Sequence, residues 1–182
     1  MLAIAITVVA LIAGCARSPR PETTSAADWP AGVKEAEVYE QVLRRYLGTP
    51  EENSFPGTTF TTVYVLDHAH SDAANPTGGQ GSSVPIPPNT RAHIISALAQ
   101  VGTVTFIADR TSVLDTSNRC AKVRNGGILI TLGTVGGDDN EAKVGIGGFV
   151  ACLGATWLTY VLRNDAGTGW KVTGTTGPRA IA

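Results

Sequence analysis

The sequence has no surplus of charge of either sign. Its 182 residues carry 14 Lys and Arg against 15 Asp and Glu, so the formal net charge is −1 at pH 7. The basic side chains form no cluster beyond two pairs, Arg17 with Arg20 and Arg44 with Arg45. Because a protein that binds nucleic acid needs a basic stripe to neutralise phosphates, this composition argues against a nucleic-acid partner.

The chain also lacks the short motifs of common catalytic sites. It has no G-x-S-x-G sequence, and only three histidines, His68, His70 and His93, are present to act as bases. Neither glycine cluster, at residues 78–81 and 145–148, carries the lysine of a phosphate-binding loop. Glycines inside a strand more often mark a bulge or close packing against another element. We therefore assign no catalytic residue, expect no cofactor, and regard an enzyme as the less favoured interpretation.

The chain opens with a run of residues, 2–14, that carry no charged side chain and end in Ile12-Ala13-Gly14-Cys15. This ending resembles the lipobox of bacterial lipoproteins, in which an aliphatic residue and two small ones precede a cysteine. The resemblance implies that residues 1–14 are a signal peptide and that Cys15 is lipidated. The thirteen uncharged residues fall short of the roughly 20 that span a bilayer. We expect a lipid-anchored protein on the extracytoplasmic face of the cell membrane.

The segment that follows Cys15 is predicted to be a flexible tether. Residues 16–32 are rich in Pro, Ser, Thr and Ala and have no apolar period. The rest of the chain has the length of one hydrophobic core and shows no internal repeat. The sequence thus predicts a signal peptide at 1–14, a lipidated cysteine and tether at 15–32, and one globular domain at 33–182.

Hydrophobic periodicity predicts two helices in the domain. Over Val33–Leu47, apolar residues recur at three- and four-residue spacing, acidic residues come first, and basic residues come last. A second helix is predicted over Asn89–Val101, with Asn89 as its N-cap and His93 on its surface. The buried stripe of this second helix is predicted to be Ile94, Ile95, Leu98 and Val101.

Runs of β-branched and aromatic residues predict a sheet. The predicted strands are Phe60–Asp67, Thr103–Ala108, Ile128–Val135, Ala142–Leu153, Thr156–Arg163 and Trp170–Thr175. Short turn sequences separate the later strands, and short connections require antiparallel neighbours. We therefore expect an α+β fold, in which a curved antiparallel sheet of about five to six strands carries two helices on one face.

The domain resembles an uncharacterised group of exported bacterial proteins. The likeness rests on Gly126–Gly133, Thr159–Leu162 and Trp170–Gly177, with the opening helix and the first strand, and it brings no activity with it. A looser resemblance, through Trp170-Lys171-Val172, is to the cone-shaped NTF2-like fold, whose helices close a curved sheet over a pocket. In that alternative, the lining of the pocket would be Tyr39, Tyr64, Asp109, Arg110 and Trp157.

Two cysteines remain besides Cys15, and an exported chain with two spare cysteines usually pairs them. Cys120 lies in the predicted loop 115–124, and strand alternation places Cys152 on the inward face of its strand. We predict a disulfide between Cys120 and Cys152. Two separate buried thiols are the alternative.

A long segment of low apolar content, residues 68–88, lies between the first strand and the second helix. It begins with His68 and His70, between Asp67 and Asp72, and this pattern is a weak candidate for a zinc or copper site. A solvated loop is the favoured interpretation, so no metal site is assigned. Because long irregular loops are usually functional or disordered, we predict a surface loop that meets a partner.

Together these features favour a lipid-anchored cell-envelope protein with a non-catalytic binding or scaffolding domain outside the cytoplasm. Its partners would be the membrane, through the lipid on Cys15, and an envelope protein or small ligand of unknown identity. The alternative is a small-molecule-binding or enzymatic NTF2-like pocket. A filled core would favour the first interpretation, and an enclosed cavity with converging polar groups would favour the second.

Overall fold

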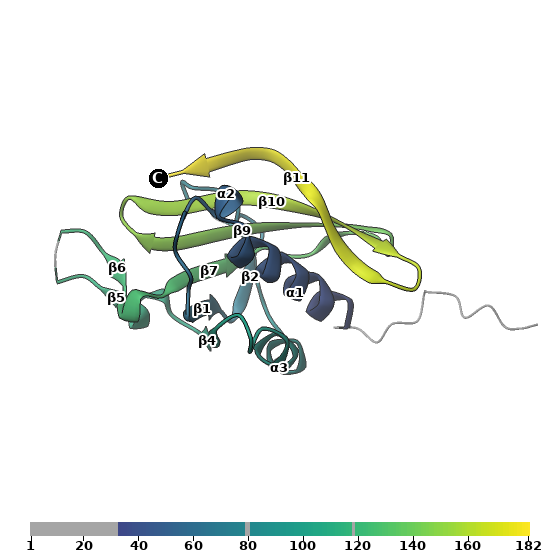
Figure 1. The fold of residues 1–182 in the computed structure, drawn as a ribbon, viewed down its shortest axis with the longest axis horizontal. Coiled ribbons are helices and arrows are strands. Elements are labelled where there is room, and N and C mark those ends of the chain that lie inside the picture. Colours follow the sequence, from purple (N-terminus) through teal and green to yellow (C-terminus); the bar gives the residue numbers. More distant parts are fainter. Residues whose placement is uncertain (1–32, 79–80, 118) are drawn as a thin grey trace, which may run out of the picture.

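The computed structural model describes residues 33–78, 81–117 and 119–182, and Figure 1 shows how their elements are arranged. The predicted signal peptide, Cys15 and the tether lie outside the described residues. The helices are α1 (Val33–Gly48), α2 (Pro50–Asn53) and α3 (Pro88–Ala97), with two 3-10 helices, η1 (Arg110–Val113) and η2 (Arg124–Gly126). The strands are β1 (Thr62–Leu66), β2 (His68–His70), β3 (Ser83–Pro85), β4 (Thr103–Ile107), β5 (Leu114–Asp115), β6 (Lys122–Val123), β7 (Ile128–Leu132), β8 (Gly136–Gly137), β9 (Glu141–Ala151), β10 (Gly154–Asp165) and β11 (Gly169–Ile181).

The first predicted helix is confirmed as α1. An acidic residue, Glu35, lies in its first turn and a basic one, Arg45, in its last, which suits the helix dipole. The apolar stripe is almost fully buried and consists of Val38, Tyr39, Val42, Leu43 and Tyr46. Because this stripe recurs every three or four residues, α1 presents one continuous apolar face to the sheet.

The second predicted helix, α3, is shorter than expected. It ends at Ala97 rather than Val101, and its N-cap is Pro87, without a side-chain hydrogen bond, rather than Asn89. Two members of the predicted stripe, Ile94 and Leu98, are fully buried, but Ile95 is 44% exposed. Because α3 ends early, its buried face extends along only about two turns.

The main sheet is mixed, which corrects the prediction of an antiparallel sheet. Its strand order is β11-β10-β9-β7-β1-β4. β1 runs parallel to both β4 and β7, whereas β7, β9, β10 and β11 pair antiparallel in turn. The short-connection rule does not hold for β1 and β4, because residues 67–102 join them through α3. A connection of that length permits a parallel crossover. The α+β class is confirmed.

The sheet is curled, and α1 lies within the curl (Figure 1). Its long strands β9, β10 and β11 have 11, 12 and 13 residues. The β10–β11 pairing shifts register between Trp157 and Thr159 and between Val161 and Leu162, and such irregularities bend strands and increase their twist. Figure 1 shows β10 and β11 arching over α1 and α2, with β1, β4 and α3 at the other end. α1 accordingly contacts both β11 and α3.

Alternate residues of the strands pack on opposite faces of the sheet. In β1, Val63 and Val65 belong to the large core that includes the stripe of α1, whereas Tyr64 and Leu66 pack against a smaller cluster. We call the face toward α1 the inner face and the opposite one the outer face. The smaller cluster lies on the outer face and consists of Val113, Leu114, Val123 and Leu129. It is built from η1 and the β5–β6 pair, which cover one part of the outer face.

Candidate ligand-binding hollow on the outer face

A hollow of about 430 Å³ opens on the outer face, between residues 70–78 and strands β7, β9 and β10. Its floor is made of alternate strand residues whose neighbours point into the inner core, namely Leu129 and Thr131 of β7, Gly147 and Phe149 of β9, and Trp157 of β10. Its walls include Leu66, His70, Asp72 and Arg110. We refer to this space as the outer-face hollow.

Glycines in β9 allow residues 70–78 to lie directly against the sheet. A Cβ atom on Gly147 would lie 2.8 Å from the carbonyl oxygen of Ala73 and 3.0 Å from Cδ1 of Trp157. A Cβ atom on Gly145 would lie 3.1 Å from Cβ of Ala74. Any larger residue at these positions would lift the segment off the strand. The interpretation of residues 145–148 as a place of close packing is therefore confirmed.

The segment that forms one wall of the hollow is more ordered than the sequence predicts. β2 and β3 form a two-stranded antiparallel sheet, in which His68 pairs with Pro85 and His70 with Ser83. Beyond β2, Ala73 is buried, and Ile86 is buried just after β3. The prediction of an irregular loop over residues 68–88 is thus wrong for its two ends, which form β2 and β3.

Arg110 brings a positive charge to the hollow. Its guanidinium carbon lies 6.0 Å from the centre of the Phe149 ring, so the group is placed over an aromatic face. The preceding Asp109 caps η1, because its carboxylate accepts a hydrogen bond of 2.8 Å from the backbone N–H of Thr111. Hydrogen bonds from the Thr111 hydroxyl and backbone lower the pKa of Asp109. Asp109 therefore fixes the start of η1, and Arg110 extends from it.

The five residues predicted to line a pocket do not come together. Arg110 and Trp157 line the outer-face hollow, whereas Asp109 caps η1. Tyr39 lies on the inner side, where its hydroxyl donates a 3.0 Å hydrogen bond to the carbonyl of Gly133 and burial raises its pKa. Tyr64 packs beside the small outer cluster and accepts a 3.1 Å hydrogen bond from Asn125.

Sequence reasoning missed Thr131, Phe149 and, as a lining residue, His70. Strand alternation was the available signal, because Thr131 lies between the fully buried Ile130 and Leu132, and Phe149 precedes Val150, which packs against the inner core. Which outward residues remain uncovered, however, depends on where residues 70–78, η1 and the β5–β6 pair lie. Those contacts join parts of the chain that are distant in sequence.

The two histidines of the H-x-H pattern have different surroundings. Nδ1 of His68 lies 2.7 Å from one carboxylate oxygen of Asp67, and the guanidinium of Arg91 lies 3.7 Å from the other oxygen. His70 lines the outer-face hollow instead. Across the described residues, no three His, Cys, Asp or Glu side chains are grouped so that they could hold a metal ion.

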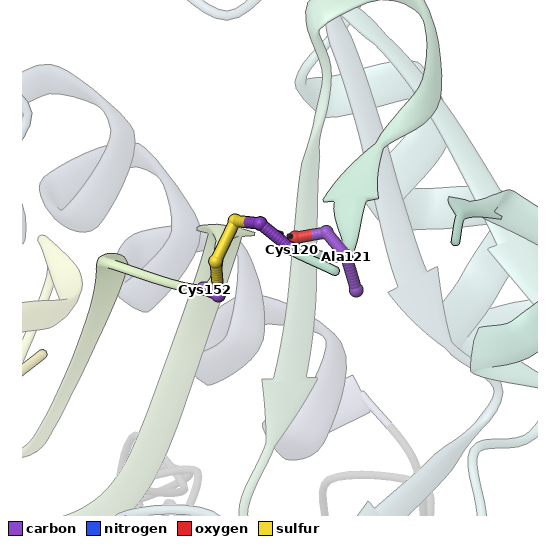
Figure 2. Close-up of a disulfide and its surroundings, with 3 residues drawn as sticks. All are labelled: Cys120, Ala121 and Cys152. Atoms are coloured by element: carbon purple, nitrogen blue, oxygen red, sulfur yellow. Dashed lines mark hydrogen bonds between the residues drawn. A yellow bond between two sulfur atoms is a disulfide. The ribbon is translucent and has the colours of Figure 1, made fainter. Parts of the chain in front are cut away.

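A disulfide lies at the rim of the hollow. Cys120 and Cys152 are at bonding distance with their Cα atoms 5.4 Å apart, and Figure 2 shows the sulfur–sulfur bond. Cys152 also lines the hollow. The prediction that Cys152 points inward is wrong, because β9 ends at Ala151 and Cys152 lies exposed in the turn to β10. The bond ties the chain between β5 and β6 to this turn.

Comparisons with protein families, with curated proteins and with solved structures found no match to this chain. None of the helices in the described part of the chain is both long and apolar enough to cross a membrane. We therefore infer function from the geometry of the domain and from the sequence features at the start of the chain.

Proposed function

We propose that this chain is a lipid-anchored cell-envelope protein whose domain is a non-catalytic binding module outside the cytoplasm. The motif Ile12-Ala13-Gly14-Cys15 supports the anchor. The pairing of Cys120 with Cys152 supports an oxidising compartment, because disulfides persist outside the cytoplasm and are rare within it. We further propose that the module binds through the outer-face hollow.

The observation that carries the binding proposal is the hollow itself. Its volume of about 430 Å³ falls within the range of roughly 300–1,000 Å³ that is typical of small-molecule sites. Apolar side chains such as Leu66, Leu129 and Phe149 supply much of its surface, and a few polar groups face the same space. Such sites usually combine apolar walls with a small number of placed polar groups.

A non-catalytic role agrees with the chemistry of the lining. Covalent catalysis needs a nucleophile hydrogen-bonded to a base. Thr131 and His70 are the hydroxyl and imidazole side chains among the described lining residues, and no hydrogen bond joins them. Glu40 and Glu52, whose pKa values are lowered, despite burial, by hydrogen bonds from Arg44 and Arg45, lie in α1 and α2 and do not line the hollow.

The alternative of an NTF2-like pocket under the helices finds less support. The space between α1 and the sheet is filled by side chains, with Tyr39 2% exposed and Leu43 and Tyr46 fully buried. A packed core of this kind leaves no room for a ligand without rearrangement. We also propose that α1 and α3 cover the same face of the sheet, because the two helices contact each other.

The binding proposal is tested by native mass spectrometry of the protein gently extracted from its own membranes. We expect wild type to retain a small molecule, and Trp157→Ala, which removes part of the floor of the hollow, to lose it. Lys171→Gln is the matched control, because Lys171 is exposed on β11 and does not line the hollow. Equal retention by wild type and Trp157→Ala would overturn the proposal.

The anchor is tested separately with Cys15→Ser. This change removes the only thiol of the lipobox, so the variant should incorporate no labelled fatty acid and should keep the heavier, unprocessed chain. Wild type processed in parallel provides the reference mass. Label incorporation by the variant would contradict the lipoprotein assignment and would leave the binding proposal standing.

A further inference from the structure

We propose that the outer-face hollow takes a small organic acid, with one carboxylate on a flat apolar body. This inference rests on the proposed binding function and adds the chemical class of the ligand. It comes from three side chains of the lining whose hydrogen-bond donors have no partner among the described residues, together with the aromatic floor.

Three side chains of the lining carry unused hydrogen-bond donors. Arg110 makes no ion pair with any described residue, and its cationic group rests over the Phe149 ring. The indole N–H of Trp157 and the ring of His70 likewise have no hydrogen-bond partner in the described part of the chain. Asp72, the one carboxylate side chain of the described lining, already has a partner and lies beside Gly81. These three donors lie in one hollow, so a ligand with an acceptor group complements them.

The charge of the lining favours a carboxylate over a phosphate. Arg110 is the only permanently cationic side chain among the described residues of the hollow. Its planar guanidinium matches a carboxylate in a bidentate arrangement, and one positive charge balances one negative charge. A phosphate monoester carries nearly two negative charges at neutral pH, so one of them would have no cationic partner among the described lining residues.

The floor of the hollow fits a flat apolar body. Trp157 is half-buried, with its indole ring held against Gly147, and Phe149 and Leu129 extend the same surface. Planar groups stack favourably on such rings. An acid with a ring satisfies both parts of the hollow.

The test uses two probes of nearly equal shape, naphthalene-2-carboxylate and its neutral analogue naphthalene-2-carboxamide. Each is titrated into the 15N-labelled protein while the indole N–H signals are followed by NMR. Trp157→Phe assigns the reporting signal. Trp170, which is 5% exposed and lies 5.2 Å from the ammonium of Lys34, is an internal control on the inner face.

We expect the carboxylate to shift the Trp157 signal, to leave Trp170 unchanged, and to bind about tenfold or more tightly than the carboxamide, as a charge-assisted hydrogen bond predicts. Arg110→Gln should abolish this preference, and Lys171→Gln should keep it. Equal affinity of wild type for both probes would overturn the acid assignment and leave the binding site standing. If neither probe shifts Trp157, both the acid assignment and the hollow as binding site are wrong. The comparison of probes on wild type needs no variant to fold.

Discussion

The inner and outer faces of the same strands differ in how completely they are covered. On the inner face, Val63, Ile130, Ile146 and Leu158 are at most 1% exposed, because α1 and the curled strands surround them. On the outer face, the small cluster and residues 70–78 cover only parts of the sheet, and Arg110 and Trp157 face the hollow between them. One face therefore supplies the stability of the domain, and the other supplies a surface on which a ligand can bind.

The disulfide gives the largest test of this comparison, because it stabilises the domain from the outer side. Cys120→Ser combined with Cys152→Ser opens a loop whose ends are 32 residues apart. In the chain-entropy model, we expect the free energy of unfolding to fall by about 3–4 kcal/mol in urea denaturation. The near-ultraviolet circular dichroism of the variant should still report a packed core. A loss below about 1 kcal/mol would show that the disulfide is absent in solution or contributes little to the stability of the domain.

The inner core gives the second test. Leu43 on α1 is fully buried, so Leu43→Ala should lower the free energy of unfolding by about 3 kcal/mol, within the range for buried leucines. Leu153→Ala is the matched control, since Leu153 is 89% exposed and should change stability by no more than about 0.5 kcal/mol. Binding of naphthalene-2-carboxylate should be unchanged in both folded variants. Loss of binding by Leu43→Ala while it remains folded would contradict the separation of the two faces.

A third test displaces residues 70–78, which form one wall of the outer-face hollow. Gly147→Ala places a methyl group against the Ala73 carbonyl and the Trp157 ring, so residues 70–78 must shift. We expect a loss of about 1–3 kcal/mol, as for overpacked sites, and weaker binding of the probe. Gly174→Ala on β11 is the control, because its added Cβ meets nothing within 4 Å. If the two variants have equal stability, the segment does not lie against β9 as described.

The smallest effect concerns pH on the helical side. Burial alone would raise the pKa of Glu40 and Glu52, but hydrogen bonds from Arg44 and His93 to Glu40, and from Arg45 and Tyr160 to Glu52, outweigh it and lower both pKa values. A carboxyl with a lowered pKa stabilises the fold above its unfolded pKa of about 4.3, and this contribution disappears as pH falls through the folded pKa.

We therefore expect stability measured by urea denaturation to decline below about pH 5, with each pair contributing no more than about 1 kcal/mol. Glu52→Gln should flatten part of this decline. Glu51→Gln is the control, because Glu51 is an exposed neighbour on the same short helix. Equal slopes for the two variants would contradict the role of the Arg45 and Tyr160 bonds.

The local elements could be predicted from the sequence because local patterns determine them. The stripe of α1 required only the spacing of residues such as Val38 and Leu43, and the strands β9 and β10 followed from their composition. The parallel pairing of β1 does not follow from the short turns, because these turns join only the later strands. The helix between β1 and β4 is predicted, and a connection that contains a helix permits parallel strands.

The candidate site could not be predicted to the same extent. Arg110 and Trp157 were among the expected pocket residues, but the pocket was expected under the helices, on the other face of the sheet. The alternation of side chains along a strand distinguishes inner from outer residues. It does not indicate which outer residues other parts of the chain cover. Cys152 shows where this reasoning fails. Alternation applies only within a strand, and β9 ends at Ala151, one residue before Cys152.

A crystal structure of the protein with naphthalene-2-carboxylate tests the central claim most directly. We expect density for the probe in the outer-face hollow, with its carboxylate paired to Arg110 and its ring against Trp157. The inner core should be unchanged from the unliganded protein. Density between α1 and the sheet, or a fully occupied probe that touches neither Arg110 nor Trp157, would contradict the assignment of binding to the outer face.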